Sequence, residues 1–267
     1  MTASESAIPA SATPRDNDVV IRAVGLRKKY PGAYALRGVS LEVRQGEVLS
    51  VIGPNGAGKT TLLHLLGGLM FPSAGHVTVF GLHRWKDSFE IRKRSAFLTA
   101  CPVMGASPTP YEFLRFLAQI YGLSKATFLE KLRSLAGEMN YLPYIKKEWR
   151  TLSTGLIKKA GLIGCFLPDV PLRILDEPFA GGIDPLGMET LYGWMQAARL
   201  RGEIIVFSTQ VLDQAEQVAD RIALLHEGST LALGSATEII RQANIPATER
   251  RPLAKAFLEL TKAASAR

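Results

Sequence analysis

A glycine-rich segment in the first quarter of the chain has the residue types that bind phosphate. It matches the pattern G-x-x-x-x-G-K-[ST] and consists of Gly53, Pro54, Asn55, Gly56, Ala57, Gly58, Lys59, Thr60 and Thr61. Glycines let consecutive backbone N–H groups converge on phosphate oxygens, and the N-terminus of a following helix adds a favourable dipole. The pattern predicts Lys59 near the β- and γ-phosphates of a nucleotide and the Thr60 hydroxyl on Mg²⁺. The alternative, a glycine-rich turn with an incidental lysine, is disfavoured because an apolar run precedes the segment and a helical pattern follows it.

Two adjacent carboxylates form a second candidate site. Asp176 and Glu177 follow the apolar run 172–175, and ligands of parallel sheets bind at the carboxyl ends of the strands, beside such a phosphate loop. We expect Asp176 to hold Mg²⁺ through water and Glu177 to polarise the water that attacks the γ-phosphate. Alone, an acidic pair after a strand is often only a turn; together with the phosphate loop it predicts a nucleotide hydrolase.

The elements that must position these residues alternate between strand and helix. Strands are predicted over 19–24, 39–43, 47–52, 76–80, 96–99, 172–175, 204–208, 221–225 and 230–233. Helices are predicted over 59–69, 111–121, 125–138, 156–167, 185–201, 212–219 and 254–264, with a basic turn at 27–32. This alternation predicts an α/β fold with a mainly parallel sheet. The stretch of about 102–167 breaks the pattern, and we interpret it as a helical insertion in the core.

Composition limits the class of protein further. The 267 residues are 47% hydrophobic and 21% charged, which is typical of a globular chain. No stretch approaches the about 18 apolar residues that cross a bilayer, and segment 1–18 lacks the basic start and apolar core of a secretory signal, so we expect a flexible tail there. Cys101 and Cys165 form neither a CxxC pair nor a zinc pattern. The net charge of +8 suggests an anionic partner: nucleic acid, nucleotide phosphate or an acidic membrane surface.

Two further segments complete a resemblance to a known family. With the segments 152–155 (LSTG) and 182–185 (GIDP), the motifs above closely resemble the nucleotide-binding subunit of ABC transporters over about 19–234. The segments 111–114 and 120–123 are similar to those of ABC-2 type exporters. The resemblance implies an ABC-type ATPase domain over 19–240, with an N-terminal antiparallel β part, a mainly parallel core sheet, the helical insertion, and a C-terminal helical extension over 241–267.

The resemblance also implies ligands and partners. Two subunits, alike or unlike, would sandwich two ATP molecules with Mg²⁺ and drive a separate integral membrane permease from the cytoplasmic side of the membrane. Tyr30 would stack on adenine, although an ordinary turn tyrosine is the alternative. Ser153 and Gly155 would donate to the γ-phosphate bound by the partner subunit, and Asp184 would couple the two sites.

Three positions depart from the family pattern. Thr154 replaces the first glycine of the family's LSGGQ signature, Gln210 replaces a histidine that contacts the γ-phosphate, and Ala100 replaces a glutamine that contacts Mg²⁺ or water. Glutamine can hydrogen-bond the phosphate and Glu177 but cannot become cationic. We therefore expect ATP binding with slow hydrolysis. A nucleotide-gated assembly or regulatory subunit with negligible turnover is the competing hypothesis.

The basic residues gather in two stretches. Residues 84–94 and 146–159 each contain five lysines or arginines and few acids. Because the resemblance places the insertion beside the membrane subunit, these stretches could contact anionic lipid headgroups; a solvated surface is the alternative. A DNA- or ribosome-associated ABC ATPase is the less favoured hypothesis, since long coiled coils and tandem nucleotide domains are lacking. No nucleic-acid partner is therefore expected.

Overall fold

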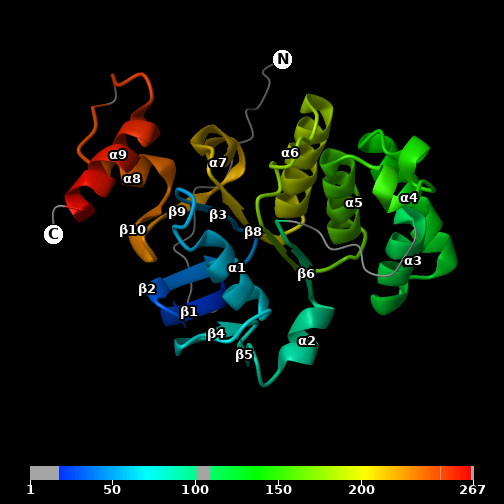
Figure 1. Cartoon of the computed structure of the whole chain (residues 1–267), viewed down its shortest axis with the longest axis horizontal. Coiled ribbons are helices and arrows are strands. Elements are labelled where there is room, and N and C mark those ends of the chain that lie inside the picture. The colour runs from blue at the N-terminus through cyan, green and yellow to red at the C-terminus, as the bar shows by residue number, and fades with distance from the viewer. Residues whose placement is uncertain (1–17, 101–108, 247, 266–267) are drawn as a thin grey trace, which may run out of the picture.

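The computed structural model describes residues 18–100, 109–246 and 248–265, arranged as two β-sheets with helices around them (Figure 1). The larger sheet has six strands in the order β10-β9-β3-β8-β7-β6. Five of them pair in parallel: β3 (Val48–Ile52), β6 (Ser95–Leu98), β7 (Leu172–Leu175), β8 (Ile204–Thr209) and β9 (Arg221–His226). The last strand, β10 (Ser229–Gly234), pairs antiparallel with β9.

The central strands of this sheet are apolar on both faces. All residues of β3, β7 and β8 are buried, as expected of parallel strands that are covered on both sides. Because β3, β8 and β7 are neighbours, their carboxyl ends lie at one edge of the sheet. That edge is where the phosphate loop, the acidic pair and Gln210 begin.

The smaller sheet is antiparallel and has the order β2-β1-β4-β5. It consists of β1 (Val19–Tyr30), β2 (Ala33–Arg44), β4 (Ala74–Val79) and β5 (Leu82–His83). Its apolar residues share a core with one face of the larger sheet and with the leucines of α1 (Lys59–Gly67). Helix α1 is therefore held between the two sheets.

Helices cover the other face of the larger sheet. A second core joins β3, β8 and β9 to α5 (Thr154–Phe166), α6 (Pro185–Leu200) and α7 (Leu212–Val218), which lie opposite α1 in Figure 1. Between β6 and β7 the chain also forms α3 (Pro110–Ile120), α4 (Lys125–Glu138) and two short 3-10 helices, η2 (Leu142–Tyr144) and η3 (Trp149–Thr151). Three more helices are α2 (Ser88–Lys93), α8 (Ala236–Gln242) and α9 (Pro252–Ser265).

The predicted fold class is confirmed, with local differences. The basic turn expected at 27–32 is wrong over most of its length, because β1 continues to Tyr30 by pairing with β2, while its pairing with β4 ends at Arg27. Helix α1 ends two residues earlier than predicted, at Gly67. Helices α2 and α8 and strand β5 were not predicted. The domain boundaries stay a prediction; residues 1–17 of the expected tail, residues 102–108 of the expected insertion, and Cys101 lie outside the described residues.

Among the helices that the structure describes, none is long and apolar enough to cross a bilayer.

Candidate functional site

The glycine-rich segment forms the loop between β3 and α1. Its last glycine, Gly58, is the N-cap of α1 and has a φ of 101°, a conformation that favours glycine. A Cβ on Gly58 would lie 2.5 Å from the Ala35 carbonyl oxygen, and one on Gly53 would lie 2.3 Å from that of Leu225. The loop is therefore packed against backbone at both ends, which explains why glycine is required there.

Lys59 opens α1 and is turned back into this loop. Only 6% of the residue is exposed, and its ammonium group donates to the carbonyls of Gly53 (2.9 Å) and Pro54 (3.3 Å). Its Nζ also lies 3.4 Å from Glu177 Oε1. The predicted phosphate-binding lysine and the predicted water-polarising carboxylate are thus ion-paired with each other.

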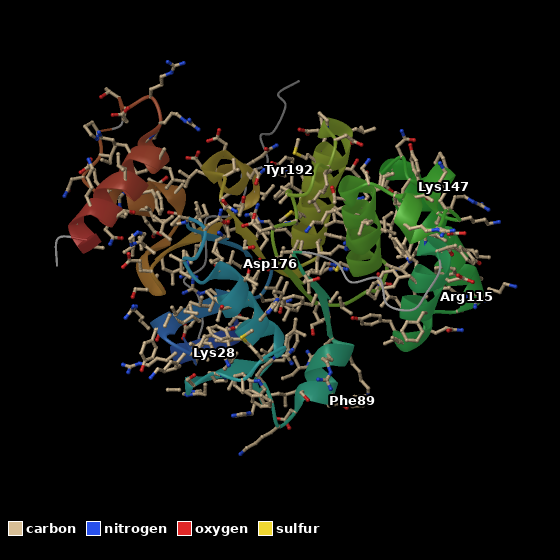
Figure 2. All side chains as sticks on the ribbon, in the orientation of Figure 1. Lys28, Phe89, Arg115, Lys147, Asp176 and Tyr192 are labelled. Atoms are coloured by element: carbon tan, nitrogen blue, oxygen red, sulfur yellow. The ribbon has the colours of Figure 1, made fainter. Side chains whose placement is uncertain are left out.

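The acidic pair is held by a serine on the neighbouring strand. Asp176 is fully buried near the centre of the molecule (Figure 2). Its Oδ1 accepts from the Ser208 hydroxyl at 2.5 Å, and the same hydroxyl oxygen accepts from the Glu177 N–H at 2.8 Å. Glu177 has a φ of 47°, a left-handed conformation that is uncommon for a residue with a side chain. Ser208 therefore holds the Asp176 carboxylate and the Glu177 backbone; sequence reasoning missed it.

A cavity of about 420 Å³ lies over the start of α1. Its lining brings the loop together with three positions from separate segments, Ala100, Glu177 and Gln210. The amide Nε2 of Gln210 lies 3.4 Å from Glu177 Oε1, which is a long contact. The other lining residues are Ala35, Asn55, Gly56, Ala57, Gly58, Lys59, Thr60 and Thr61.

Oxygen donors suited to Mg²⁺ lie at this site. Asp176 Oδ2 is buried and has no hydrogen-bond partner among the described residues, and Thr60 is exposed on the first turn of α1. Mg²⁺ binds through one or two such protein oxygens, with substrate phosphates and water as its other ligands. In keeping with this, the described part of the chain holds no cluster of three or more His, Cys, Asp or Glu side chains able to bind a metal by itself. The donor set therefore fits Mg²⁺.

Several predicted site residues do not line this cavity: Tyr30, Gly53, Pro54, Ser153, Gly155, Asp176 and Asp184. Tyr30 is 41% exposed, and its hydroxyl lies 3.5 Å from Met70 Sδ rather than over the loop. Ser153, Thr154 and Gly155 form the N-terminus of α5, where Ser153 is the N-cap. Within one chain, the structure does not bring Tyr30 or the start of α5 to the phosphate loop.

The start of α5 packs on the segment that precedes α6. The Thr154 hydroxyl donates to the Gly181 carbonyl at 3.1 Å, and a Cβ on Gly155 would lie 2.2 Å from the Gly182 carbonyl oxygen. Asp184 caps α6 by accepting from the Gly187 N–H at 2.7 Å. The side chain at position 154 is therefore directed toward its own chain.

Two adjacent lysines of α5 hold this region together, and sequence reasoning did not identify their roles. Lys159 donates to Asp184 at 2.6 Å and to the Met139 carbonyl at 2.9 Å. The hydrogen bond from Lys159, and then that from the Gly187 backbone, lower the pKa of Asp184. Lys158 donates to the Ala100 carbonyl at 2.6 Å, so the segment after β6 is tied to α5.

Comparison with known proteins identifies the family. A family model described as ABC transporter matches residues 36–180, more than half of the chain. The chain belongs to the ABC transporter family. An ABC transporter ATP-binding protein of Nostoc sp. is 31% identical over 87% of this chain and 71% of its own length. The ABC-type transporter ATP-binding protein EcsA of Bacillus subtilis is 32% identical over 85% of this chain and 90% of its own.

Solved structures agree with this assignment. A structure of an ATP-binding subunit of an ABC transporter is 31% identical, with a TM-score of 0.83 over 91% of this chain and 99% of that one. A dimeric ATP-binding cassette bound to ADP and Pi is 19% identical, with a TM-score of 0.74 over 80% of this chain and 98% of that one, and shows the shared fold. The predicted family and its ATP-binding class are thus confirmed.

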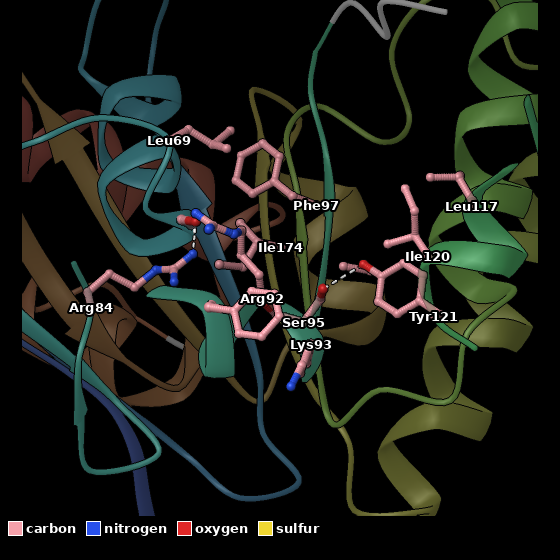
Figure 3. A pocket seen from close by; sticks show the side chains of 13 residues that line it. Leu69, Arg84, Arg92, Lys93, Ser95, Phe97, Leu117, Ile120, Tyr121 and Ile174 are labelled. Carbon is pink, nitrogen blue, oxygen red and sulfur yellow. Dashed lines mark hydrogen bonds between the residues drawn. The ribbon is translucent and has the colours of Figure 1, made fainter. Parts of the chain in front are cut away.

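This ABC transporter subunit has a second cavity, away from the phosphate loop. It occupies about 410 Å³ between the end of α1, α2, β6 and α3. In Figure 3, Arg84 lies on one side, and Leu117, Ile120 and Tyr121 of the α3 region lie on the other. The Tyr121 hydroxyl donates to the Ser95 carbonyl at 2.8 Å and joins α3 to β6.

The two basic stretches are less accessible than expected. Arg84, Lys158 and Lys159 are only 2–3% exposed and donate to backbone carbonyls, so they cannot reach lipid headgroups. The other basic residues of the two stretches are exposed, and Lys147 lies at the edge of the molecule in Figure 2. These exposed residues are Lys86, Arg92, Lys93, Arg94, Lys146, Lys147 and Arg150.

Proposed function

We propose that this ATP-binding subunit holds MgATP in the cavity over α1, hydrolyses it slowly, and transmits its binding to a membrane permease. The observation that carries the proposal is the convergence of Lys59, Glu177 and Gln210 on one cavity, with the buried Asp176 next to Glu177 in the chain. In this arrangement the phosphate-binding and hydrolytic groups are adjacent before nucleotide is present.

The residues divide the chemistry between them. Lys59 leaves its carbonyl partners and Glu177 to contact the β- and γ-phosphates, and the loop N–H groups bind the phosphate oxygens. Mg²⁺, held through Thr60 and Asp176, would neutralise phosphate charge. Once Lys59 has moved, Glu177 accepts a hydrogen bond from the attacking water, with Gln210 donating to that carboxylate or to the γ-phosphate.

Slow turnover follows from what the chain lacks around these groups. Gln210 supplies a neutral donor where a histidine would add positive charge as the phosphate accumulates negative charge. Ala100 has no polar side chain, and its carbonyl already accepts from Lys158. These missing groups act in the hydrolytic step. We therefore expect MgATP to bind while its hydrolysis is slow.

Three of the remaining predicted residues require a second subunit. Ser153, Gly155 and Asp184 lie outside the cavity of their own chain, which supports a head-to-tail dimer in which they serve the partner's ATP. Tyr30 would move from Met70 to stack on adenine. An unlike partner subunit with a complete signature would raise the turnover at this chain's loop.

The proposed membrane partner is an integral permease, reached from the cytoplasmic side. The cavity between α1, α2, β6 and α3 is the surface that we assign to it, because its rim exposes large apolar side chains. Export is the favoured direction: similar proteins include the bacitracin transport ATP-binding protein BcrA of Bacillus licheniformis, 30% identical over 79% of this chain and 68% of its own. Lipid contact is proposed only for the exposed basic residues.

The competing function is a nucleotide-gated subunit that binds ATP with negligible turnover. The position of Gln210, whose amide lies 3.4 Å from Glu177, favours it, because a neutral amide adds no positive charge as the phosphate accumulates negative charge. Single-turnover measurements separate the two. ATP that survives for hours on the protein at saturating Mg²⁺ would support the gate.

Nucleotide binding and turnover by variants test the proposal. Lys59→Met is expected to abolish MgATP binding, whereas Glu177→Gln keeps it and lowers single-turnover hydrolysis about 10²–10⁴-fold. Glu227→Gln, an exposed carboxylate outside the cavity, is the matched control and should behave as wild type. Unchanged hydrolysis in Glu177→Gln would place the chemistry elsewhere.

A further inference from the structure

The first turn of α5 is covered by a segment of its own chain. Gly155, the second residue of the helix, is buried. A Cβ on Gly155 would lie 2.2 Å from the Gly182 carbonyl oxygen and 3.4 Å from that of Gly181. Gly181 and Gly182 are themselves exposed, and we call these two residues the glycine strap. The strap therefore lies between Gly155 and the solvent.

A side-chain hydrogen bond holds the strap on the helix. The Thr154 hydroxyl donates to the Gly181 carbonyl at 3.1 Å. The Lys158 side chain also packs against the strap, since a Cβ on Gly181 would lie 3.6 Å from the Lys158 Cε. The family's LSGGQ signature has a glycine in place of Thr154 and therefore cannot make this hydrogen bond. The tether is thus a consequence of one of the three departures from the family pattern.

The backbone of the strap is suited to movement. Gly181 and Gly182 have φ values of 89° and 80°, and a Cβ on Gly182 would meet nothing within 4 Å. Glycine changes between left- and right-handed conformations without the steric cost that a Cβ imposes. On either side the chain is held: the Ala180 N–H donates to the Glu177 carbonyl at 3.1 Å, and Asp184 caps α6. The strap can therefore shift between two fixed ends.

The strap limits access to a proposed phosphate-binding group. Because Gly155 is at the second position of α5, its N–H has no acceptor within the helix. The proposed function assigns this N–H to the γ-phosphate bound by the partner subunit. A buried N–H can reach that phosphate only after the strap has shifted. Pairing of the two subunits must therefore break the hydrogen bond between Thr154 and Gly181.

We propose that Thr154 is a positioning residue that holds the glycine strap over Gly155 and thereby weakens the MgATP-dependent pairing of the subunits. This inference rests on the proposed function, because it requires the head-to-tail dimer. Loss of one such hydrogen bond changes an equilibrium by about two- to tenfold. The effect differs from steric crowding by Thr154, which depends on the size of the side chain and not on its hydroxyl.

The isosteric substitution Thr154→Val separates the hydroxyl from the bulk of the side chain. It is made in full-length chains that carry Glu177→Gln and so retain MgATP, and sedimentation velocity measures the dissociation constant of the dimer in MgATP. Thr154→Val is expected to strengthen the dimer about two- to tenfold, whereas Thr154→Ser keeps the donor and should leave it unchanged. Thr237→Val, the same change on an exposed threonine in the first turn of α8, is the matched control.

Amide hydrogen exchange at Gly155 tests the strap itself, in the full-length chain without nucleotide. The Gly155 amide should exchange about two- to tenfold faster in Thr154→Val than in wild type or Thr154→Ser, because the untethered strap opens more often. The affinity of the separate subunit for MgATP should be equal in these variants, since Thr154 does not line the nucleotide cavity.

Two results would overturn this inference alone: a dimer no stronger with Thr154→Val than without it, or unchanged exchange at Gly155. A stronger dimer with Thr154→Gly but not with Thr154→Val would show that crowding, and not the hydroxyl, opposes pairing. If MgATP produces no dimer in any variant, the head-to-tail pairing of the proposed function is refuted together with this inference.

Discussion

Replacing Arg173 should destabilise the protein more than almost any other single change of a charged residue. Arg173 lies in β7, the strand that directly precedes Asp176, and is 1% exposed. It donates to the carbonyls of Cys165 (3.1 Å), Pro168 (2.9 Å) and Val170 (3.1 Å) and to the carboxylate of Glu203. The Arg173 side chain therefore supplies hydrogen-bond donors to three backbone carbonyls where the chain passes from α5 to β7.

The size of the effect follows from what the substitution leaves behind. Arg173→Met fills similar space but leaves three buried carbonyls without donors, each costing about 1–3 kcal/mol before relaxation. Glu203 keeps its hydrogen bond from Arg201 at 2.7 Å, so its charge remains paired. Relaxation and entering water recover part of the loss, and we expect a net loss of about 3–5 kcal/mol in the free energy of unfolding.

Equilibrium unfolding in urea, followed by circular dichroism, measures this difference. A loss of that size should lower the melting temperature by about 10 °C in a chain of this length. Arg201→Met is the matched control, because Arg201 is 57% exposed at its side chain and contacts the same carboxylate. It should cost no more than about 1 kcal/mol. A loss for Arg173→Met within 1 kcal/mol of the control would show that the buried carbonyls find other donors and that this reasoning is wrong.

Three further predictions concern the site. Gln210→His should raise the steady-state hydrolysis rate about tenfold near pH 6, where the imidazole is cationic; an unchanged or lower rate counts against slow turnover arising at this position. Gly155→Ala should lower the free energy of unfolding by about 1–3 kcal/mol in urea, because its Cβ meets the Gly182 carbonyl oxygen at 2.2 Å. The pKa of the Asp184 carboxyl is lower in the folded protein than in the unfolded chain. The ionised carboxylate therefore stabilises the fold fully above its unfolded pKa, and this stabilisation is lost as the pH falls through its folded pKa. The melting-temperature difference between wild type and Asp184→Asn should therefore shrink below about pH 4, and a constant difference would exclude the ion pair as its source.

Elements with local sequence signals were predicted well. Helix α4 has the predicted limits, Lys125–Glu138, because Ser124 supplies an N-cap by accepting from the Thr127 N–H. Strand β7 also has its predicted limits, as a short apolar run before the acidic pair. Helix α8 was missed although a signal exists: Ser235 and Glu238 form a capping box at its start.

The incorrect predictions concern residues whose structure depends on backbone groups that are distant in the sequence. Residues 27–29 look like a basic turn, but they continue β1 because β2 pairs with all three of them, and β4 also pairs with Arg27. Arg84 and Lys158 look like surface charges, yet their partners are carbonyls, at Leu66 and Ala100. Every residue has a carbonyl, so no sequence pattern marks such a partner. The cavity around Arg84 was missed for the same reason.

The candidate site likewise has parts that the sequence predicts and parts that depend on contacts between distant segments. The phosphate loop and acidic pair are contiguous motifs, and the structure brings Lys59 and Glu177 together as their positions at the ends of β3 and β7 suggested. The link through Ser208 depends on the pairing of β7 with β8 and has no motif of its own. The position of Tyr30 beside Met70 likewise depends on how the β1–β2 hairpin packs.

The rate of phosphate release by the intact complex with its permease tests the central claim most directly. At saturating MgATP, we predict a turnover below about one per second, at the bottom of the usual range for enzymes, that disappears in Glu177→Gln while MgATP affinity is retained. A wild-type rate of several per second that still depends on Glu177 would contradict the proposal that Ala100, Thr154 and Gln210 slow the hydrolytic step.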